Sequence, residues 1–239
     1  MKNNPKNTRY NAPIRIMKSI IKTFKKRRKT IGKAPDSPCV YLARHLDTTG
    51  VIRAFCEIDD ELTPWVLSVF FDKNQAREHF YNYTFCKKKS HCKPFRFFAS
   101  NICARFVCYC VKSTCAIPVY RNEQSSKSIT TIKQSVNALL QGKKLIIFVD
   151  KDYASKGDTD QEIYQGFVAV AQLYKRKTGK DLAFVPISFL QTRTVICPPV
   201  YLMQPERDCT QLAKKSSIGQ AETSAEFFAS IKSSIFATE

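Results

Sequence analysis

The sequence predicts an α/β fold in which a largely parallel sheet is flanked by helices. Short apolar segments at Cys39–Ala43, 144–149 and 182–187 have the length and composition of buried strands. Segments with helical spacing of apolar residues, 128–140 and 163–175, alternate with them. Because parallel strands need crossover connections, which helices usually supply, the alternation favours βαβ units.

The other expected elements follow from the same patterns and from helix stop signals such as Gly142. In chain order they are a buried strand at 64–71, a polar helix at 73–83, a buried or membrane-facing helix at 103–111, a strand at 117–120 and a surface helix at 222–236. We expect three regions: an N-terminal arm at 1–35, an α/β domain at 36–204, and a polar, helical extension of that domain at 205–239.

Length and composition indicate a globular core. The chain has 239 residues, of which 44% are hydrophobic and 17 are Phe, so disorder, collagen-like repeats and a multi-span membrane protein all fit this composition poorly. The most apolar stretch, 95–120, is interrupted by Arg96, Arg105, Lys112 and Pro118. A spanning helix needs about 20 largely uncharged residues, so we expect no transmembrane segment.

Ten cysteines raise the questions of disulfides and of a metal site. A domain of this size folds without disulfides, and the N-terminus lacks the pattern of a secretory leader, which favours reduced thiols in the cytoplasm. Seven potential zinc ligands fall within thirty residues but include no Cys-x2-Cys pair; they are Cys86, His91, Cys92, Cys103, Cys108, Cys110 and Cys115. We therefore expect buried apolar thiols there, and no metal site.

The net charge of +19 is unevenly distributed. Residues 1–35 contain twelve basic and no acidic residues, whereas the other 204 residues contain 27 basic and 20 acidic ones, a net charge of +7. A basic arm on a mildly basic body indicates an anionic partner, which could be nucleic acid, a membrane surface or a phosphorylated small molecule.

The basic arm contains a predicted amphipathic helix that ends before Gly32. Its apolar stripe and cations suit the interface of an anionic bilayer; the expected membrane-binding residues are Met17, Ile20, Ile21, Phe24, Lys25, Lys26, Arg27 and Arg28. The alternatives are an ordinary helix packed on the core and a nucleic-acid contact. We expect a protein of the cytoplasm that associates peripherally with the inner face of the cell membrane.

His45 is the histidine best placed for chemistry. It follows an apolar strand and lies between Arg44 and Asp47. Ligands of open α/β sheets bind at the carboxyl ends of the strands. An imidazole beside a carboxylate can take a proton from a hydroxyl group. A histidine in an ordinary loop has the same local pattern.

An ordered set of segments surrounds this histidine. The strand ending at His45 is followed by the apolar strand 117–120 with Arg121, then by 148–151 (Phe-Val-Asp-Lys), Gly166 and the Val-Pro pair 185–186. In order and spacing, residues 39–188 resemble the glycerophospholipid acyltransferase superfamily, in particular lysophosphatidate acyltransferases and their divergent bacterial relatives. The family's His-x4-Asp motif has Gly50 in place of its aspartate, and its Phe-Pro-Glu-Gly motif lacks the proline and the glycine.

The resemblance implies a glycerolipid acyltransferase-like fold and transfer of a fatty acyl group to a lysophospholipid-like acceptor, with lysophosphatidate favoured. The donor would be acyl-CoA or acyl carrier protein, used as co-substrate without any other cofactor. His45 would be the general base and Asp47 its orienter. Arg121 would hold the acceptor phosphate, and Asp150 would help to fix the acceptor. Further contacts to phosphate or oxyanion would come from Arg44 and Lys151.

Two other function classes remain open at this stage. Gly50 in place of the family's aspartate suits an inactive lipid-binding relative. The basic segments 15–33 and 87–96 suit a nucleic-acid-binding protein, but no recognised nucleic-acid-binding motif is present, so no specific nucleic acid is expected as a partner.

Overall fold

The computed structural model describes residues 10–24, 28–85, 93–120, 125–150, 166–202 and 216–236. The strands, in chain order, are β1 (Lys29–Ile31), β2 (Cys39–Ala43), β3 (Leu62–Leu67), β4 (Ile117–Val119), β5 (Lys144–Phe148), β6 (Ala183–Phe189), β7 (Arg193–Ile196) and β8 (Val200–Tyr201). The α-helices are α1 (Ala12–Phe24), α2 (Asp47–Glu57), α3 (Lys73–His79), α4 (Lys93–Ser113), α5 (Ser125–Leu140), α6 (Val168–Thr178) and α7 (Ser216–Ile235). A 3-10 turn at Ser68–Phe71 and a π turn at Phe80–Thr84 flank α3.

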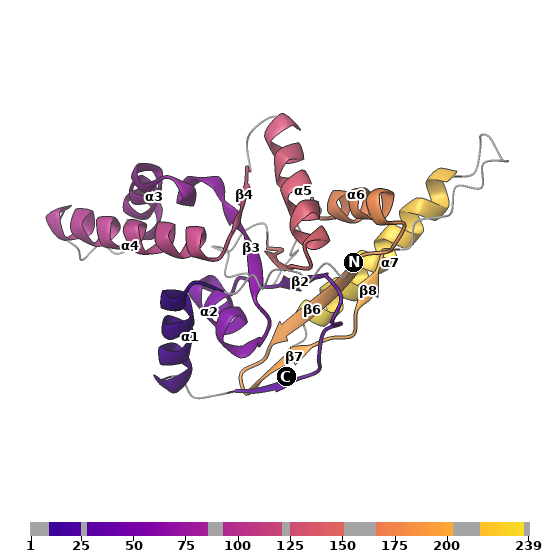
Figure 1. Ribbon diagram of the computed structural model, residues 1–239, viewed down its shortest axis with the longest axis horizontal. Helices are drawn as coiled ribbons and strands as arrows, with labels where there is room; N and C mark the ends of the chain where they lie inside the picture. Colours follow the sequence, from indigo (N-terminus) through magenta and orange to yellow (C-terminus); the bar gives the residue numbers. More distant parts are fainter. Residues whose placement is uncertain are drawn as a thin grey trace, which may run out of the picture.

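The described strands form one mixed, mostly parallel sheet in the order β1-β7-β6-β2-β5-β3-β4, with β8 also beside β6 (Figure 1). Parallel pairs join β2 to β5 and β6, and β3 to β4 and β5. The only antiparallel pairs among the described strands are those of β6 with β7 and β8. The predicted α/β class and largely parallel sheet are thus confirmed.

Helices cover both faces of the sheet, and the side chains of β2 alternate between them. Val40 and Leu42 face a core cluster that includes residues of α5, α6 and α7. Tyr41 and Ala43 face a second cluster that includes residues of α2. All five residues of β2 are fully buried. Burial on both faces explains why this strand is a continuous apolar run.

Helix α7 includes all but the last residue of the predicted helix 222–236 and has one buried face. The sequence predicts a surface helix at 222–236; in the structure, Phe227, Ile231 and Ile235 of this helix are buried in the same core cluster as β2 and β5. Their spacing of four residues places them on one face of the helix. Polar residues between them gave the segment its surface-like composition.

The second predicted strand, 64–71, is corrected at both ends. β3 begins at Leu62 and ends at Leu67, and the following apolar residues form the 3-10 turn. Asp72 then caps α3, because its side chain accepts hydrogen bonds from the backbone N–H groups of Asn74 and Gln75, each 2.9 Å long. The apolar composition typical of a strand therefore extends to Phe71, beyond the end of β3 at Leu67.

The N-terminal arm packs against the body. Ile14 is buried, and the Nζ atom of Lys18 donates a 2.9 Å hydrogen bond to the backbone oxygen of Ile58. The hydroxyl of Tyr10 donates a 2.8 Å hydrogen bond to the backbone oxygen of Leu62. β1 lies in the sheet, paired with β7. The described residues of the region 1–35 are therefore joined to the rest of the fold by both packing and strand pairing.

The residues expected to bind a membrane differ in their exposure to solvent. Ile20 is exposed, whereas Met17 and Ile21 are half-buried. Arg28 is partly exposed and contacts the fold: its Nε donates a 2.7 Å hydrogen bond to the backbone oxygen of Gln191. The side chain of Phe24 and residues Lys25, Lys26 and Arg27 lie outside the described part of the chain. Membrane binding by this helix stays a prediction.

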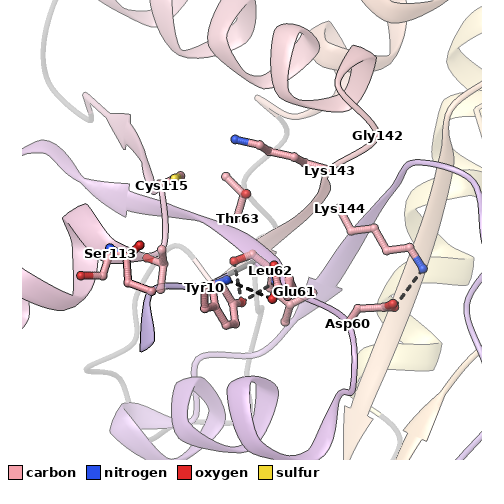
Figure 2. A pocket seen from close by; sticks show the side chains of 12 residues that line it. Tyr10, Asp60, Glu61, Leu62, Thr63, Ser113, Cys115, Gly142, Lys143 and Lys144 are labelled. Atoms are coloured by element: carbon pink, nitrogen blue, oxygen red, sulfur yellow. Dashed lines mark hydrogen bonds and ion pairs between the residues drawn. The ribbon is translucent and has the colours of Figure 1, made fainter. Parts of the chain in front are cut away.

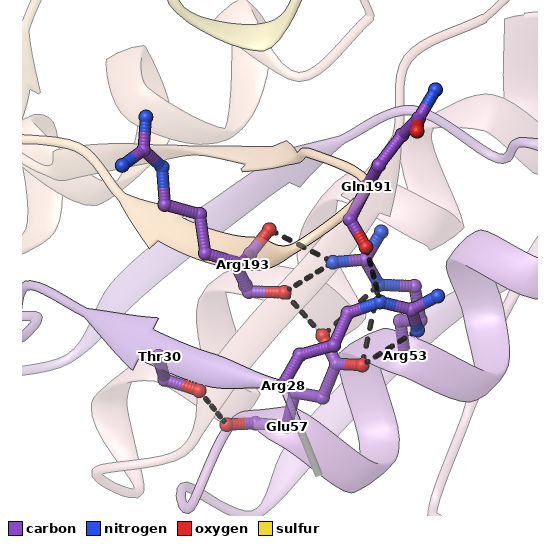
Figure 3. A network of polar contacts seen from close by, with 7 residues as sticks. Arg28, Thr30, Arg53, Glu57, Gln191 and Arg193 are labelled. Carbon is purple, nitrogen blue, oxygen red and sulfur yellow. Dashed lines mark hydrogen bonds and ion pairs between the residues drawn. The ribbon is translucent and has the colours of Figure 1, made fainter. Parts of the chain in front are cut away.

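A buried polar network attaches the end of α2 to the sheet edge (Figure 3). Arg53, with a side chain 4% exposed, donates from Nε to Glu57 at 3.0 Å, and Glu57 also accepts a hydrogen bond from the hydroxyl of Thr194. Arg53 donates further to the backbone oxygen of Arg193, at 3.0 Å. Arg28 lies 3.5 Å from Glu57. Burial lowers the pKa of Arg53, while Glu57 favours its charged form.

No helix in the described part of the chain is long and apolar enough to cross a membrane.

Candidate functional site

The candidate site lies where β2 and β5 end, side by side. Ala43 pairs with Phe148 in the parallel register, and the backbone N–H of Val149 donates a 3.1 Å hydrogen bond to the oxygen of Ala43. Both strands therefore deliver their following residues to one edge of the sheet. His45 and Asp150 meet there, although 105 positions separate them in the sequence.

Asp150 connects the two strand ends. Its carboxylate accepts a hydrogen bond from the backbone N–H of His45 through Oδ2, and its Oδ1 lies 3.9 Å from Nε of Arg44. The Asp150 side chain is 13% exposed. The structure thus brings together three of the predicted site residues, and it gives Asp150 a definite task, which is to fix the backbone at His45.

Two aromatic side chains pack against His45 and Arg44. The ring of Phe148 packs edge-on against the imidazole of His45, with centroids 5.3 Å apart and an interplanar angle of 66°. The guanidinium carbon of Arg44 lies 4.4 Å from the centroid of the Phe236 ring. Phe148 belongs to the segment 148–151, which matches the family's Phe-Pro-Glu-Gly motif in part, so its nearness to the site could have been inferred. Nothing in the sequence indicated that Phe236, beyond the last helix, would cover Arg44.

The turn from β2 into α2 is tight. Leu46 has a φ of 44° and a ψ of 50°, the left-handed conformation that side chains other than glycine, asparagine and aspartate rarely adopt. Gly50 then donates a 3.1 Å backbone hydrogen bond to the oxygen of His45. A Cβ atom added at Gly50 would lie 2.3 Å from the backbone oxygen of His45. With this backbone, the position that holds aspartate in the resembling family has no room for a side chain.

Gly50→Ala should reduce stability. A glycine to alanine change inside an unobstructed helix raises stability by roughly 0.5–1 kcal/mol, but here the added methyl group meets backbone, which cannot rotate away. We expect the free energy of unfolding to fall by about 1–3 kcal/mol in urea denaturation. Thr49→Ala, at the exposed neighbouring position of α2, serves as the control and should change little. A Gly50→Ala protein as stable as the wild type would contradict the close contact.

The environment of Asp150 makes stability depend on pH. Burial raises the pKa of its carboxyl above the usual 3.8, and the hydrogen bond from His45 and the charge of Arg44 oppose this shift only in part. The folded protein therefore holds this proton more tightly than the unfolded chain does. As the pH rises from the usual value through the raised pKa, this group lowers the free energy of unfolding.

Asp150→Asn tests this linkage. The amide oxygen can still accept the N–H of His45, and the side chain no longer titrates. The free energy of unfolding of the variant minus that of the wild type should become more positive between about pH 4 and about pH 7. Urea denaturation at both pH values measures it. A difference that is the same at both would show that the charge of Asp150 is not the cause.

Three other predicted site residues have no described side chain. Asp47 is the first residue of α2, but its side chain is not among the described ones. Arg121 and Lys151 both lie outside the described residues. Their roles as orienter and phosphate contacts stay predictions.

A cavity of about 300 Å³ lies elsewhere, near the beginnings of β3 and β5 (Figure 2). Its lining includes Tyr10, Glu61, Cys115 and Lys143. Lys144, also in the lining, forms a 2.9 Å ion pair with Asp60. Because β3 and β5 are parallel, this cavity is at the opposite end of the strands from His45.

Among the described residues, no three His, Cys, Asp or Glu side chains gather as metal ligands would. Comparisons of the chain with family models, with curated proteins and with solved structures found no match.

Proposed function

We propose that the chain transfers a fatty acyl group from acyl-CoA or acyl carrier protein to a hydroxyl of a lysophospholipid-like acceptor at a membrane surface, with lysophosphatidate as the favoured acceptor. The observation that carries this proposal is the place of His45. It follows the central strand β2 at the carboxyl edge of the sheet, and Asp150 of the neighbouring strand end holds its backbone. β2 has β5 on one side and β6 on the other, and crevices at such edges bind ligands in open α/β sheets.

The chemistry requires one base and no covalent enzyme intermediate. The acceptor hydroxyl attacks the thioester carbonyl as His45 takes its proton, so that a carbon–oxygen bond forms. The carbon–sulfur bond then breaks, and the proton passes to the departing thiolate. In this proposal Asp47 orients the imidazole, Asp150 helps to fix the acceptor, Arg121 binds the acceptor phosphate, and Arg44 and Lys151 add positive charge near it.

Turnover by the purified chain tests the proposal. The protein is incubated with labelled acyl-CoA, and separately with labelled acyl carrier protein, in the presence of vesicles that contain lysophosphatidate. Labelled phosphatidate should form with at least one donor, and more slowly with an acceptor that lacks the phosphate. No product from either donor, on lysophosphatidate or a panel of other lysolipids, would contradict acyl transfer.

One observation favours a second candidate, a lipid-binding protein of the same fold without turnover. The contact between Gly50 and the backbone of His45 leaves no space for the carboxylate that the resembling family carries at this position. Under this candidate, the protein binds vesicles, the binding survives His45→Gln, and no acceptor yields product.

A further inference from the structure

Helices α3 and α4 form a separate layer that extends away from the sheet (Figure 1). One side of α4 is buried: Ala104 and Cys108 pack against Ala76 of α3, with Phe70 and Phe80 beside them. This small cluster accounts for only one face of a helix of 21 residues.

The opposite side of α4 exposes large apolar side chains. Phe98, Ile102, Phe106 and Tyr109, which we call the α4 stripe, are 64%, 52%, 54% and 46% exposed. Steps of four, four and three residues place them on one face of the helix. Scattered single apolar residues are ordinary on a surface, but a contiguous row of aromatic and aliphatic side chains indicates an interaction surface.

The charges on α4 indicate what covers this surface. Arg105 and Lys112 flank the α4 stripe at helical spacing, Lys93 begins the helix, and all three are exposed. Residues 93–113 contain no acidic side chain. A second copy of this helix would bring like charges together, whereas an anionic bilayer offers both hydrocarbon for the stripe and negative headgroups for the cations.

We propose that α4 lies in the interface of an anionic bilayer, with the α4 stripe among the acyl chains and Arg105 and Lys112 at the headgroups. The sequence predicts that 103–111 is either buried or membrane-facing; in the structure one side of this helix packs against α3, and the other exposes the α4 stripe to the bilayer proposed here. This proposal depends on the exposure and the charge of side chains on α4 and not on catalysis. It therefore applies equally to an active enzyme and to an inactive lipid-binding protein.

Sedimentation of the full chain with vesicles tests the proposal without requiring turnover. The wild type should bind vesicles of phosphatidylglycerol and phosphatidylcholine more strongly than vesicles of phosphatidylcholine alone. The triple variant Phe98→Ser, Ile102→Ser, Phe106→Ser should bind the anionic vesicles more weakly, by roughly tenfold or more. The matched control is Ile129→Ser with Leu140→Ser on α5, where the replaced side chains are 48% and 49% exposed; it should bind as the wild type does.

A second measurement covers the case in which the triple variant does not fold. Phe98→Trp places a fluorophore in the α4 stripe, and its emission should shift to the blue when anionic vesicles are added. Bound protein without that shift would overturn the proposal. So would unchanged binding by a folded triple variant, or loss of binding through Ile20→Ser on α1 alone. A dimer that the triple variant abolishes, with no vesicle binding by the wild type, would assign the stripe to self-association instead.

Discussion

Replacing His45 with glutamine is expected to lower kcat/KM for acyl transfer by about 10²–10⁴-fold, the usual contribution of a general base. Glutamine preserves a polar side chain of similar length but cannot accept a proton at neutral pH. The backbone N–H of residue 45 and its hydrogen bond to Asp150 are unaffected by the change. The loss should therefore appear in turnover, measured by formation of labelled product, and not in the urea denaturation curve.

His79→Gln is the matched control for this experiment. His79 lies on α3, with its ring 5.1 Å from that of Phe70 and 5.0 Å from that of Tyr83, outside the candidate site. The control should retain wild-type turnover. Equal product from the His45→Gln protein and the wild type would exclude His45 as the base.

Glu57→Ala should cause the largest loss of stability, a decrease of about 3–5 kcal/mol in the free energy of unfolding. The substitution removes the carboxylate that pairs with Arg53, whose side chain is only 4% exposed. The guanidinium would then keep its charge in a buried position with only neutral hydrogen-bond partners. Urea denaturation monitored by circular dichroism measures the loss.

A double variant separates the buried charge from simple loss of packing. Arg53→Met with Glu57→Leu replaces both charged groups with apolar side chains and should recover most of the stability. Asp36→Ala is the control, because it removes an exposed ion pair in which the side chain of Asp36 is 88% exposed and that of Lys33 is 81% exposed. This change should alter the free energy of unfolding little. If Glu57→Ala cost no more than Asp36→Ala, the network around Arg53 would not stabilise the fold.

Strands that are buried on both faces could be predicted from their apolar sequence. Elements whose position or burial depends on contacts with distant parts of the chain could not. β2 is apolar throughout, and β5 is apolar from Leu145 onward, because helices cover both of their faces, so their patterns are visible in the sequence. β1 has only three residues, of which Lys29 and Ile31 are exposed, and its place beside β7 depends on a partner far away in the chain. The buried face of α7 could not be predicted, because three buried side chains among many polar ones do not alter its composition.

The candidate site, like the fold, could be predicted only in part. The resemblance implies that His45 and Asp150 share one site, and in the structure they meet because the parallel strands β2 and β5 end at the same edge of the sheet. The close contact of Gly50 could not be foreseen, because it depends on the left-handed conformation of Leu46 and on the resulting path of α2. The cover that Phe236 provides over Arg44 depends on the docking of the last helix.

The strand order also determines when the sheet can form during synthesis. β2 leaves the ribosome early, but its two neighbours are β5, which begins at Lys144, and β6, which begins at Ala183. β1 must wait longer still, since its partner β7 ends at Ile196. Until Lys144 and the residues that follow it have been synthesised, β2 therefore has neither of its neighbouring strands to pair with. Pairing between strands so far apart in the sequence is intrinsically slow, and apolar strands are open to aggregation until it occurs.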